Sequence, residues 1–404
     1  MTRIALVLSG GGARAAYAAG VLRYVMRALG PKLGARIKFD IITGTSAGAI
    51  NGAFIASMSD DLPTAAEALW DHWNQLTINK VYRFGAKQLW RVPRSILSDS
   101  SGHPRGEVAL ADVTPLRRMI RHQIDWSRLR RCVRDGHIET FAVSATELAT
   151  SRSIVFVDGA GPAHPILHGN NSFFRPRLAR IGAEHVLASS AIPLLFPPVK
   201  VGGRHYLDGG LGMNTPLRPA VRLGADKVLV LSLRHARPPS QDTPEHEAPR
   251  PQTGSNPTWA QVVGKTMSAV LLDRAAHDVE RLQRHNRMIE WGVENWGPSY
   301  AEKLDMFMSE QRGSTYRTIR PLLLQPSEDL GRLASEVTQD TRFGQGADDL
   351  TMRALRFLSG ANETGENDAM SYMLFDPVFV RQLLELGERD AAERKEELEA
   401  FFVS

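Results

Sequence analysis

The sequence predicts an α/β fold, a three-layer sandwich in which helices flank a mostly parallel central sheet. Short aliphatic segments alternate with helical segments through the first 235 residues, at the spacing of βαβ units. Two of these aliphatic segments lead directly into glycine-rich turns that are followed by helices. The aliphatic segments contain few polar residues, as expected of strands that are buried on both faces of a parallel sheet.

Each element follows from the local sequence. Ile4 to Leu8 is an aliphatic strand that ends at a run of glycines, and Ala13 to Leu29 is a helix that ends at Gly30-Pro31. A second strand is predicted from Phe39 to Thr43, and a helix of small residues from Ala47 to Met58. Four further strands are predicted over Thr140–Ser144, Ile154–Val157, His205–Leu207 and Lys227–Leu233.

The chain divides by composition into an α/β domain, a linker and a C-terminal region. Residues 1–235 hold the predicted sheet, and within them residues 77–135, rich in arginine and aromatic residues, are predicted to form a cap or insertion. Residues 236–258 contain six prolines and few aliphatic residues, which is typical of a linker. Residues 259–404 are predicted to be mainly helical, because residues 259–290 and 380–401 show helical periodicity.

Composition and charge limit the class of protein. The chain is 43% hydrophobic and 23% charged, which is ordinary for a globular protein. Its net charge of +5 divides into +15 for residues 1–240 and −10 for residues 241–404. A basic first half favours contact with an anionic surface, although attraction between the two halves explains the asymmetry equally well. The single cysteine, Cys132, excludes an internal disulfide framework and a thiolate metal cluster, and we expect neither a metal nor a cofactor.

The cellular location of the protein is predicted from the presence or absence of secretory and membrane-spanning hydrophobic segments. The N-terminal residues lack a secretory hydrophobic region, and no segment is a convincing membrane-spanning helix. Residues 41–59 carry no charge, but polar residues and glycines interrupt them, which fits a buried strand and helix better. We therefore expect a cytoplasmic protein that at most lies on a membrane surface.

The strongest chemical signal is Gly44-Thr45-Ser46-Ala47-Gly48, a G-x-S-x-G motif between a predicted strand and a predicted helix. A nucleophile on such a tight turn sits in strained backbone geometry, and flanking glycines leave room for the turn. The helix that follows directs its N-terminal dipole toward the serine and favours developing negative charge there. The motif therefore indicates Ser46 as a nucleophile, with a glycine-rich packing turn as the alternative.

A second glycine-rich turn, Gly10-Gly11-Gly12-Ala13-Arg14, also joins a strand to a helix. Backbone N–H groups in such a loop can stabilise the oxyanion of an acyl transfer. The same segment fits the relaxed dinucleotide fingerprint G-x-G-x-x-A through Ala15. That interpretation requires an acidic residue at the end of the second strand, whereas Asp40 lies at its beginning, so we rank it lower.

The third signal is Leu207-Asp208-Gly209-Gly210, at the end of a short strand. An aspartate released from a strand by glycines is placed to meet a serine on a neighbouring strand. A turn aspartate without chemical function is the common alternative.

Together the three motifs resemble the patatin-like phospholipase family over about residues 4–235, and the sequence is more similar to its bacterial members than to the plant storage proteins. The resemblance implies that the nucleophile is Ser46, that the base is Asp208 without a histidine, and that Gly10, Gly11, Gly12 and Arg14 form the oxyanion hole. The order of the motifs along the chain agrees, as does the run from Ala188 to Pro198. One departure is Ala15, where the family usually has glycine.

The resemblance implies a lipid acyl hydrolase, a serine hydrolase of phospholipase A, lysophospholipase or esterase type that forms an acyl-enzyme. Asp208 would accept the Ser46 proton, which requires partial desolvation to raise its pKa. Two alternatives stay open at this point. One is a catalytically weak lipid-binding or scaffold protein of the same fold, favoured by Ala15; the other is a Ser-His-Asp esterase that uses His235.

The expected partner is an acyl lipid. The basic segment from Lys80 to Arg134, with aromatic residues such as Trp90 and Trp126, is compatible with contact to an anionic membrane. A solvated cap with a local aromatic core explains the same pattern equally well. We expect no nucleic acid partner, because no stacking or finger motif accompanies the arginines.

Overall fold

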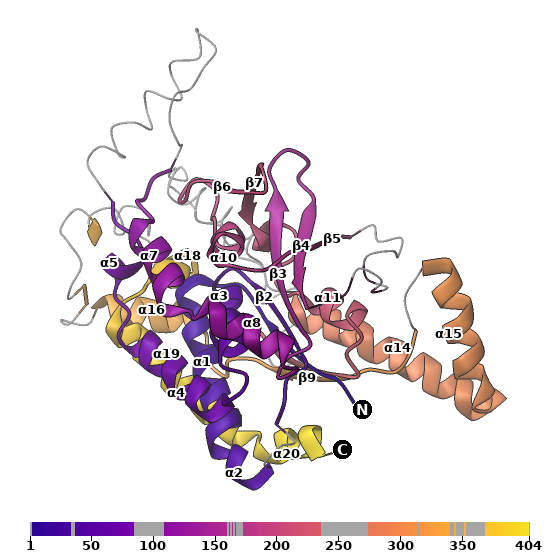
Figure 1. The fold of residues 1–404 in the computed structure, drawn as a ribbon. Coiled ribbons are helices and arrows are strands. Elements are labelled where there is room, and N and C mark those ends of the chain that lie inside the picture. Colours follow the sequence, from indigo (N-terminus) through magenta and orange to yellow (C-terminus); the bar gives the residue numbers. More distant parts are fainter. Residues whose placement is uncertain are drawn as a thin grey trace, which may run out of the picture.

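The computed structural model describes residues 2–33, 37–84, 109–159, 161, 164, 166, 173–235, 274–312, 316–339, 343–344, 351–352 and 368–403. Within these residues the strands form one sheet with the order β5-β4-β3-β2-β1-β8-β9, and β7 pairs with both β3 and β6 (Figure 1). The strands are β1 (Ile4–Leu8), β2 (Ile41–Thr45), β3 (Thr140–Glu147), β4 (Ser153–Asp158), β5 (Arg175–Leu178), β6 (Val199–Val201), β7 (Arg204–Asp208), β8 (Lys227–Leu231) and β9 (Arg320–Leu324).

The sheet is mostly parallel. Strands β3, β2, β1, β8 and β9 form a run of four parallel pairs, and β4 and β5 also pair in parallel. Antiparallel pairing occurs between β3 and β4, between β3 and β7, and between β6 and β7. The predicted fold class, a mostly parallel sheet between helices, is therefore confirmed.

Two hydrophobic cores lie on opposite faces of the sheet because strand side chains alternate. On β1, Leu6 and Leu8 belong to one core, whereas Ala5 and Val7 belong to the other. The first core is covered by α1 (Ala16–Arg23), α3 (Ala47–Ser57), α4 (Leu62–Asn74) and α19 (Pro377–Glu393), and the second by α11 (Leu217–Arg222) and α14 (Ala275–Trp296). The result is a three-layer sandwich.

The remaining helices extend these layers. They are α2 (Gly30–Leu33), α5 (Ile78–Val81), α7 (Thr114–Gln123), α8 (Trp126–Arg134), α10 (Ala183–Ser189), α15 (Ser299–Arg312), α16 (Leu330–Gln339), α18 (Asp368–Met373) and α20 (Lys395–Val403). Short helical turns lie at Gly12–Ala15, Tyr24–Ala28 and Gly209–Leu211. No helix in the described ranges is both long enough and apolar enough to cross a membrane.

Helices α1 and α19 cross at very short range. A Cβ atom at Gly20 would lie 2.1 Å from the Leu384 carbonyl oxygen, and one at Gly387 would lie 2.1 Å from that of Tyr17. Each helix thus presents a glycine where the backbone of the other passes. This crossing holds the C-terminal region against the helix that follows β1.

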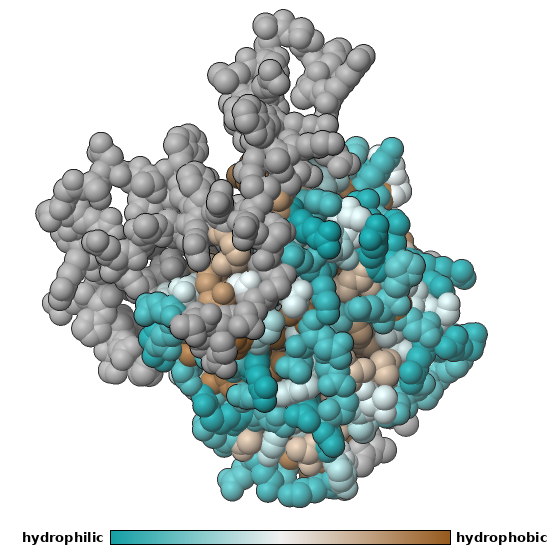
Figure 2. Space-filling model, turned by 90° about the vertical axis from the view of Figure 1, so that its left-hand side faces the viewer, coloured by the Kyte–Doolittle hydropathy of each residue, from teal (hydrophilic) through white to brown (hydrophobic). Residues whose placement is uncertain are grey.

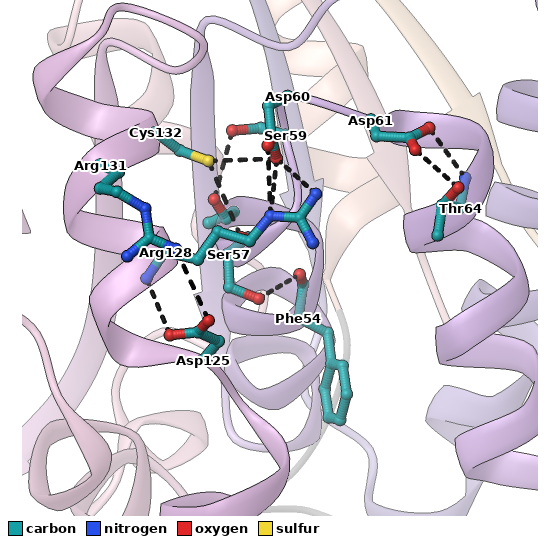
Figure 3. A network of polar contacts seen from close by, with 11 residues as sticks. Phe54, Ser57, Ser59, Asp60, Asp61, Thr64, Asp125, Arg128, Arg131 and Cys132 are labelled. Atoms are coloured by element: carbon teal, nitrogen blue, oxygen red, sulfur yellow. Dashed lines mark hydrogen bonds and ion pairs between the residues drawn. The ribbon is translucent and has the colours of Figure 1, made fainter.

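Helix α8 is held against the end of α3 by a polar network (Figure 3). Asp125 caps α8 by accepting from the backbone N–H groups of Ser127 and Arg128. The Arg128 guanidinium pairs with Asp60 at 3.0 Å, and the Cys132 thiol lies 3.4 Å from the same carboxylate. Cys132 is therefore a buried residue of the α8 interface.

The predicted central strands agree with the structure except at their ends. β1 has the predicted bounds, and β2 begins and ends two residues later than predicted. Strands β5, β6 and β9 were not predicted. The C-terminal region is mainly helical and also adds β9 to the sheet. The predicted linker, residues 236–258, and residues 85–108 of the predicted cap lie outside the described residues, so the domain division stays a prediction.

Candidate active site

Ser46 lies on the sharp turn between β2 and α3. Its φ angle is 53°, in the left-handed region that non-glycine residues rarely adopt. It occupies the N-cap position of α3, and the residue is only 4% exposed. This is the strained strand-to-helix turn that the G-x-S-x-G motif predicts.

The two glycines of the motif are required by close backbone contacts. A Cβ atom at Gly44 would lie 2.6 Å from the carbonyl oxygen of Gly48. One at Gly48 would lie 2.4 Å from the carbonyl oxygen of Leu8. Any larger residue at either position would therefore push the turn away from β1 or from its own helix.

Strand pairing brings Asp208 beside Ser46. One edge of β3 pairs with two strands in succession. It pairs with β2 as far as Ser144, which lies opposite Thr45, and with β7 from Ala145 onward. Asp208, the last residue of β7, lies opposite Ala145. Two strands that meet end to end along β3 thus place the two side chains together. The Ser46 hydroxyl donates to Asp208 Oδ2 at 2.6 Å.

The Asp208 carboxylate is fully buried and has two donors. Besides Ser46, the Gly210 N–H donates to Oδ1 at 2.7 Å. Burial raises the pKa of this carboxyl to about 6, although the Ser46 hydroxyl and the Gly210 amide both oppose the rise. The residue is therefore ionised at pH 7 and closer to neutrality than an ordinary aspartate, which suits a proton acceptor.

Ser189, at the end of α10, fixes the backbone of the turn at Ser46. Its hydroxyl accepts from the Ser46 N–H at 2.8 Å and donates to the Ser144 carbonyl at 2.6 Å. The hydroxyl thus connects the turn to β3. Sequence analysis did not identify this residue, because nothing in the local pattern distinguishes it from its neighbours in the run from Ala188 to Pro198.

The glycine loop after β1 lies directly against Ser46. A Cβ atom at Gly10 would lie 3.1 Å from Ser46 Cβ. The Gly10 N–H donates to the Asn214 carbonyl at 3.0 Å, and the Asn214 side chain donates back to the Gly10 carbonyl at 3.1 Å. In this arrangement the Gly10 amide is engaged and is no oxyanion donor, so the amides of Gly11 and Gly12 are the remaining candidates.

Arg14 contacts the C-terminal region. Its Nε donates to the Ser371 hydroxyl at 2.6 Å, and its guanidinium lies 4.1 Å from the centre of the Tyr372 ring. A Cβ atom at Gly12 would lie 2.0 Å from the Tyr372 carbonyl oxygen. Helix α18 therefore lies immediately against the glycine loop.

A small apolar cavity of ≈ 40 Å³ lies at Ser46, with room for only a few water molecules. Its wall includes Gly12, Trp73 and Tyr82 from the N-terminal half and Tyr372, Met373 and Phe375 from the C-terminal region. The Tyr82 hydroxyl donates to the Met373 carbonyl at 2.6 Å, and the Phe375 ring is stacked on that of Trp73. Sequence analysis missed these C-terminal wall residues.

The other candidate residues are placed elsewhere. His235 contacts the Pro326 carbonyl at 3.1 Å, and no hydrogen bond joins it to Ser46 or Asp208. Ala15 is buried, accepts a hydrogen bond from Asn51 through its carbonyl, and is absent from the cavity wall. Within the described part of the chain, no cluster of three or more His, Cys, Asp or Glu side chains is arranged to hold a metal ion.

Comparison with known proteins identifies the family. The family model described as patatin-like phospholipase matches residues 6–221, more than half of the chain. No curated protein matches the chain by sequence.

Two solved structures are similar. One is VipD from Legionella pneumophila, with a TM-score of 0.30 and 12% identity, covering 95% of this chain and 66% of that one. The other is human GIVD cytosolic phospholipase A2 in complex with methyl gamma-linolenyl fluorophosphonate, with a TM-score of 0.40 and 15% identity, covering 99% of this chain and 58% of that one. This chain thus spans less than two thirds of the length of either, and likenesses at these TM-scores carry no functional argument. The family match, which supports a lipid hydrolase activity, is the finding that decides the assignment: this chain belongs to the patatin-like phospholipase family.

Proposed function

We propose that the protein is a serine acyl hydrolase that cleaves carboxylic ester bonds of phospholipids or related acyl lipids. The observation that carries the proposal is the 2.6 Å hydrogen bond between the Ser46 hydroxyl and the buried Asp208 carboxylate. A strained nucleophile turn and an apolar cavity at the same serine support it.

The chemistry needs only these two side chains and water. Ser46 Oγ attacks the ester carbonyl carbon while its proton passes to Asp208, and the carbonyl oxygen becomes an oxyanion. When the tetrahedral intermediate collapses, the alcohol leaves with the proton from Asp208 and the acyl group stays on Ser46. Water then attacks this ester, giving its proton to Asp208, and the proton returns to Ser46 as the fatty acid departs.

The oxyanion donors in this proposal are the amides of Gly11 and Gly12. They begin a helical turn, and the first N–H groups of a helix have no partner within it. Gly12 also lines the cavity at Ser46. Arg14 supports this oxyanion loop by holding it against α18 through its bond to Ser371.

The experiment is covalent labelling with a fluorophosphonate together with hydrolysis of a short p-nitrophenyl ester. We expect label on Ser46, and we expect Ser46→Ala and Asp208→Asn to lose at least about a thousandfold in kcat/KM. Ser190→Ala is the matched control, because Ser190 lines the same cavity while its hydroxyl donates to the Val186 carbonyl. Label on another serine, or substantial hydrolysis by Ser46→Ala, contradicts the proposal.

A further inference from the structure

A polar cleft of ≈ 530 Å³ lies beside the catalytic cavity, between α4 and α5 on one side and α7 on the other. Three of its wall residues are cationic, Lys80, Arg83 and Arg118, and Asp112 is the one carboxylate among the described wall residues. Helices α5 and α7 lie at the left of Figure 1, on the side turned to the viewer in Figure 2, where the described surface is mainly hydrophilic with small hydrophobic areas.

The carboxylate in the cleft forms no ion pair with the arginines among the described residues, and one carboxylate faces three cations. Asp112 Oδ1 accepts from the backbone N–H and the hydroxyl of Thr114, at 2.9 and 2.6 Å. Among the described residues, neither Arg83 nor Arg118 forms an ion pair. Two nearby arginines outside this cleft do form ion pairs, Arg121 with Glu184 and Arg128 with Asp60.

The positive charge of the cleft belongs to these side chains and not to the buried histidine. Burial lowers the pKa of His72 to about 4, and the nearby Lys80 ammonium also lowers it, so His72 is neutral at pH 7. Lys80 donates to the Gln75 carbonyl at 2.7 Å and lines the cleft. The two guanidinium groups have the planar, multiple-donor geometry that matches a phosphate.

The cleft and the catalytic cavity share part of their walls. His72, Leu76 and Met119 line both. A molecule with a phosphate at one end and an acyl ester at the other would therefore meet cations in the outer cleft and Ser46 in the apolar cavity. This combination of features is that of an anionic glycerophospholipid.

We propose that this cleft binds the phosphate of an anionic glycerophospholipid whose ester lies at Ser46. The inference rests on the proposed function and adds a substrate class to it. The same cations would also attract free phosphate, so the ligand must be tested in both forms.

The test measures binding in the Ser46→Ala background, where no hydrolysis is needed. Titration calorimetry with dihexanoyl phosphatidic acid, kept below its micelle concentration, is compared with dihexanoyl phosphatidylcholine and inorganic phosphate. We expect phosphatidic acid to bind at least tenfold more tightly than either. Replacing both cleft arginines, Arg83→Gln with Arg118→Gln, should remove that preference, and Arg83→Lys with Arg118→Lys, which keeps the charge but not the planar donors, should restore only part of it.

The control pair is Arg130→Gln with Arg131→Gln, which removes the same charge from α8, outside the cleft, and should change binding less than twofold. Equal affinity for inorganic phosphate and phosphatidic acid would overturn the inference in favour of a simple anion site. So would unchanged binding by the cleft glutamine pair. In the Ser46-containing protein the control pair on α8 should retain hydrolysis of a neutral p-nitrophenyl ester within twofold, whereas absence of that hydrolysis in the unmodified protein refutes the proposed function itself.

Discussion

The buried carboxylate of Asp208 should make the folded protein less stable than it would be without this charge. Its pKa is raised from 3.8 to about 6, chiefly by burial. At about 1.36 kcal/mol per pKa unit, the ionised group therefore costs the folded state about 3 kcal/mol at pH 7. Asparagine is isosteric with aspartate but uncharged, so Asp208→Asn removes this cost and should raise the free energy of unfolding. The same variant should abolish ester hydrolysis, because asparagine cannot accept the Ser46 proton.

The predicted gain depends on pH in a defined direction. Because the pKa is higher in the folded than in the unfolded protein, the folded state binds more protons between about pH 4 and 6. The stability of the unmodified protein relative to Asp208→Asn should therefore decrease as the pH rises through that window. The difference should be near zero at pH 4 and close to 3 kcal/mol at pH 7.

Urea denaturation of both proteins at pH 4, 5, 6 and 7 measures this difference. Asp376→Asn is a matched control, since Asp376 is also fully buried but caps α19 by accepting from the Val378 N–H, and its replacement should bring no gain. A gain below about 1 kcal/mol at pH 7, or one that does not change with pH, would refute the assignment of a raised pKa to Asp208.

The remaining predictions concern the pH profile and the glycines. Fluorophosphonate labelling of Ser46 should slow about tenfold for each pH unit below about 6, because protonated Asp208 accepts no proton. A labelling rate that does not change between pH 4 and 8 would exclude Asp208 as the proton acceptor. Gly48→Ala should lower the free energy of unfolding by about 3 kcal/mol or more in urea denaturation, since its Cβ would meet a β1 carbonyl oxygen at 2.4 Å. Gly52→Ala is the control: its nearest contact is a side chain at 3.1 Å, and it should change that free energy by less than about 1 kcal/mol. Gly387→Ala should likewise lower the free energy of unfolding by about 3 kcal/mol, because its Cβ would meet an α1 carbonyl oxygen at 2.1 Å. Gly30→Ala, with nothing within 4 Å of the added Cβ, should leave the free energy of unfolding unchanged. Equal losses in the two variants would show that the α1–α19 crossing does not require glycine.

The central sheet could be predicted from the sequence because its strands are buried on both faces and therefore nearly uninterrupted in hydrophobicity. Strand β1 is fully buried, and its predicted bounds are those observed. The two outermost strands, β5 and β9, each contain a proline, Pro176 and Pro321. Proline has no N–H to donate to the hydrogen bonds between strands, so a proline in a short segment argues against predicting a strand there. Edge strands nevertheless tolerate proline, and β5 and β9 were therefore missed.

The candidate site could be predicted only as far as its motifs reach. Glycines around Ser46 and after Asp208 are visible in the sequence because the turns require them. The meeting of β2 and β7 along β3 depends on register, which the sequence of either strand alone does not specify. Ser189 was missed for a similar reason, since its hydroxyl acts between two segments 45 and 143 residues away.

The C-terminal region packs on the sheet and on the cavity at Ser46, although the family model ends at residue 221. Strand β9 extends the sheet beyond β8, and α19 packs on α1 at their facing glycines. Helix α18, which precedes α19, contacts Arg14 and supplies part of the wall around Ser46. The conformation of the glycine loop is thus coupled to residues more than 350 positions away. The cavity at Ser46 is only ≈ 40 Å³, and Tyr372 and Met373 of α18 form part of its wall, so the C-terminal region helps to set the space that the proposed acyl substrate would have at Ser46.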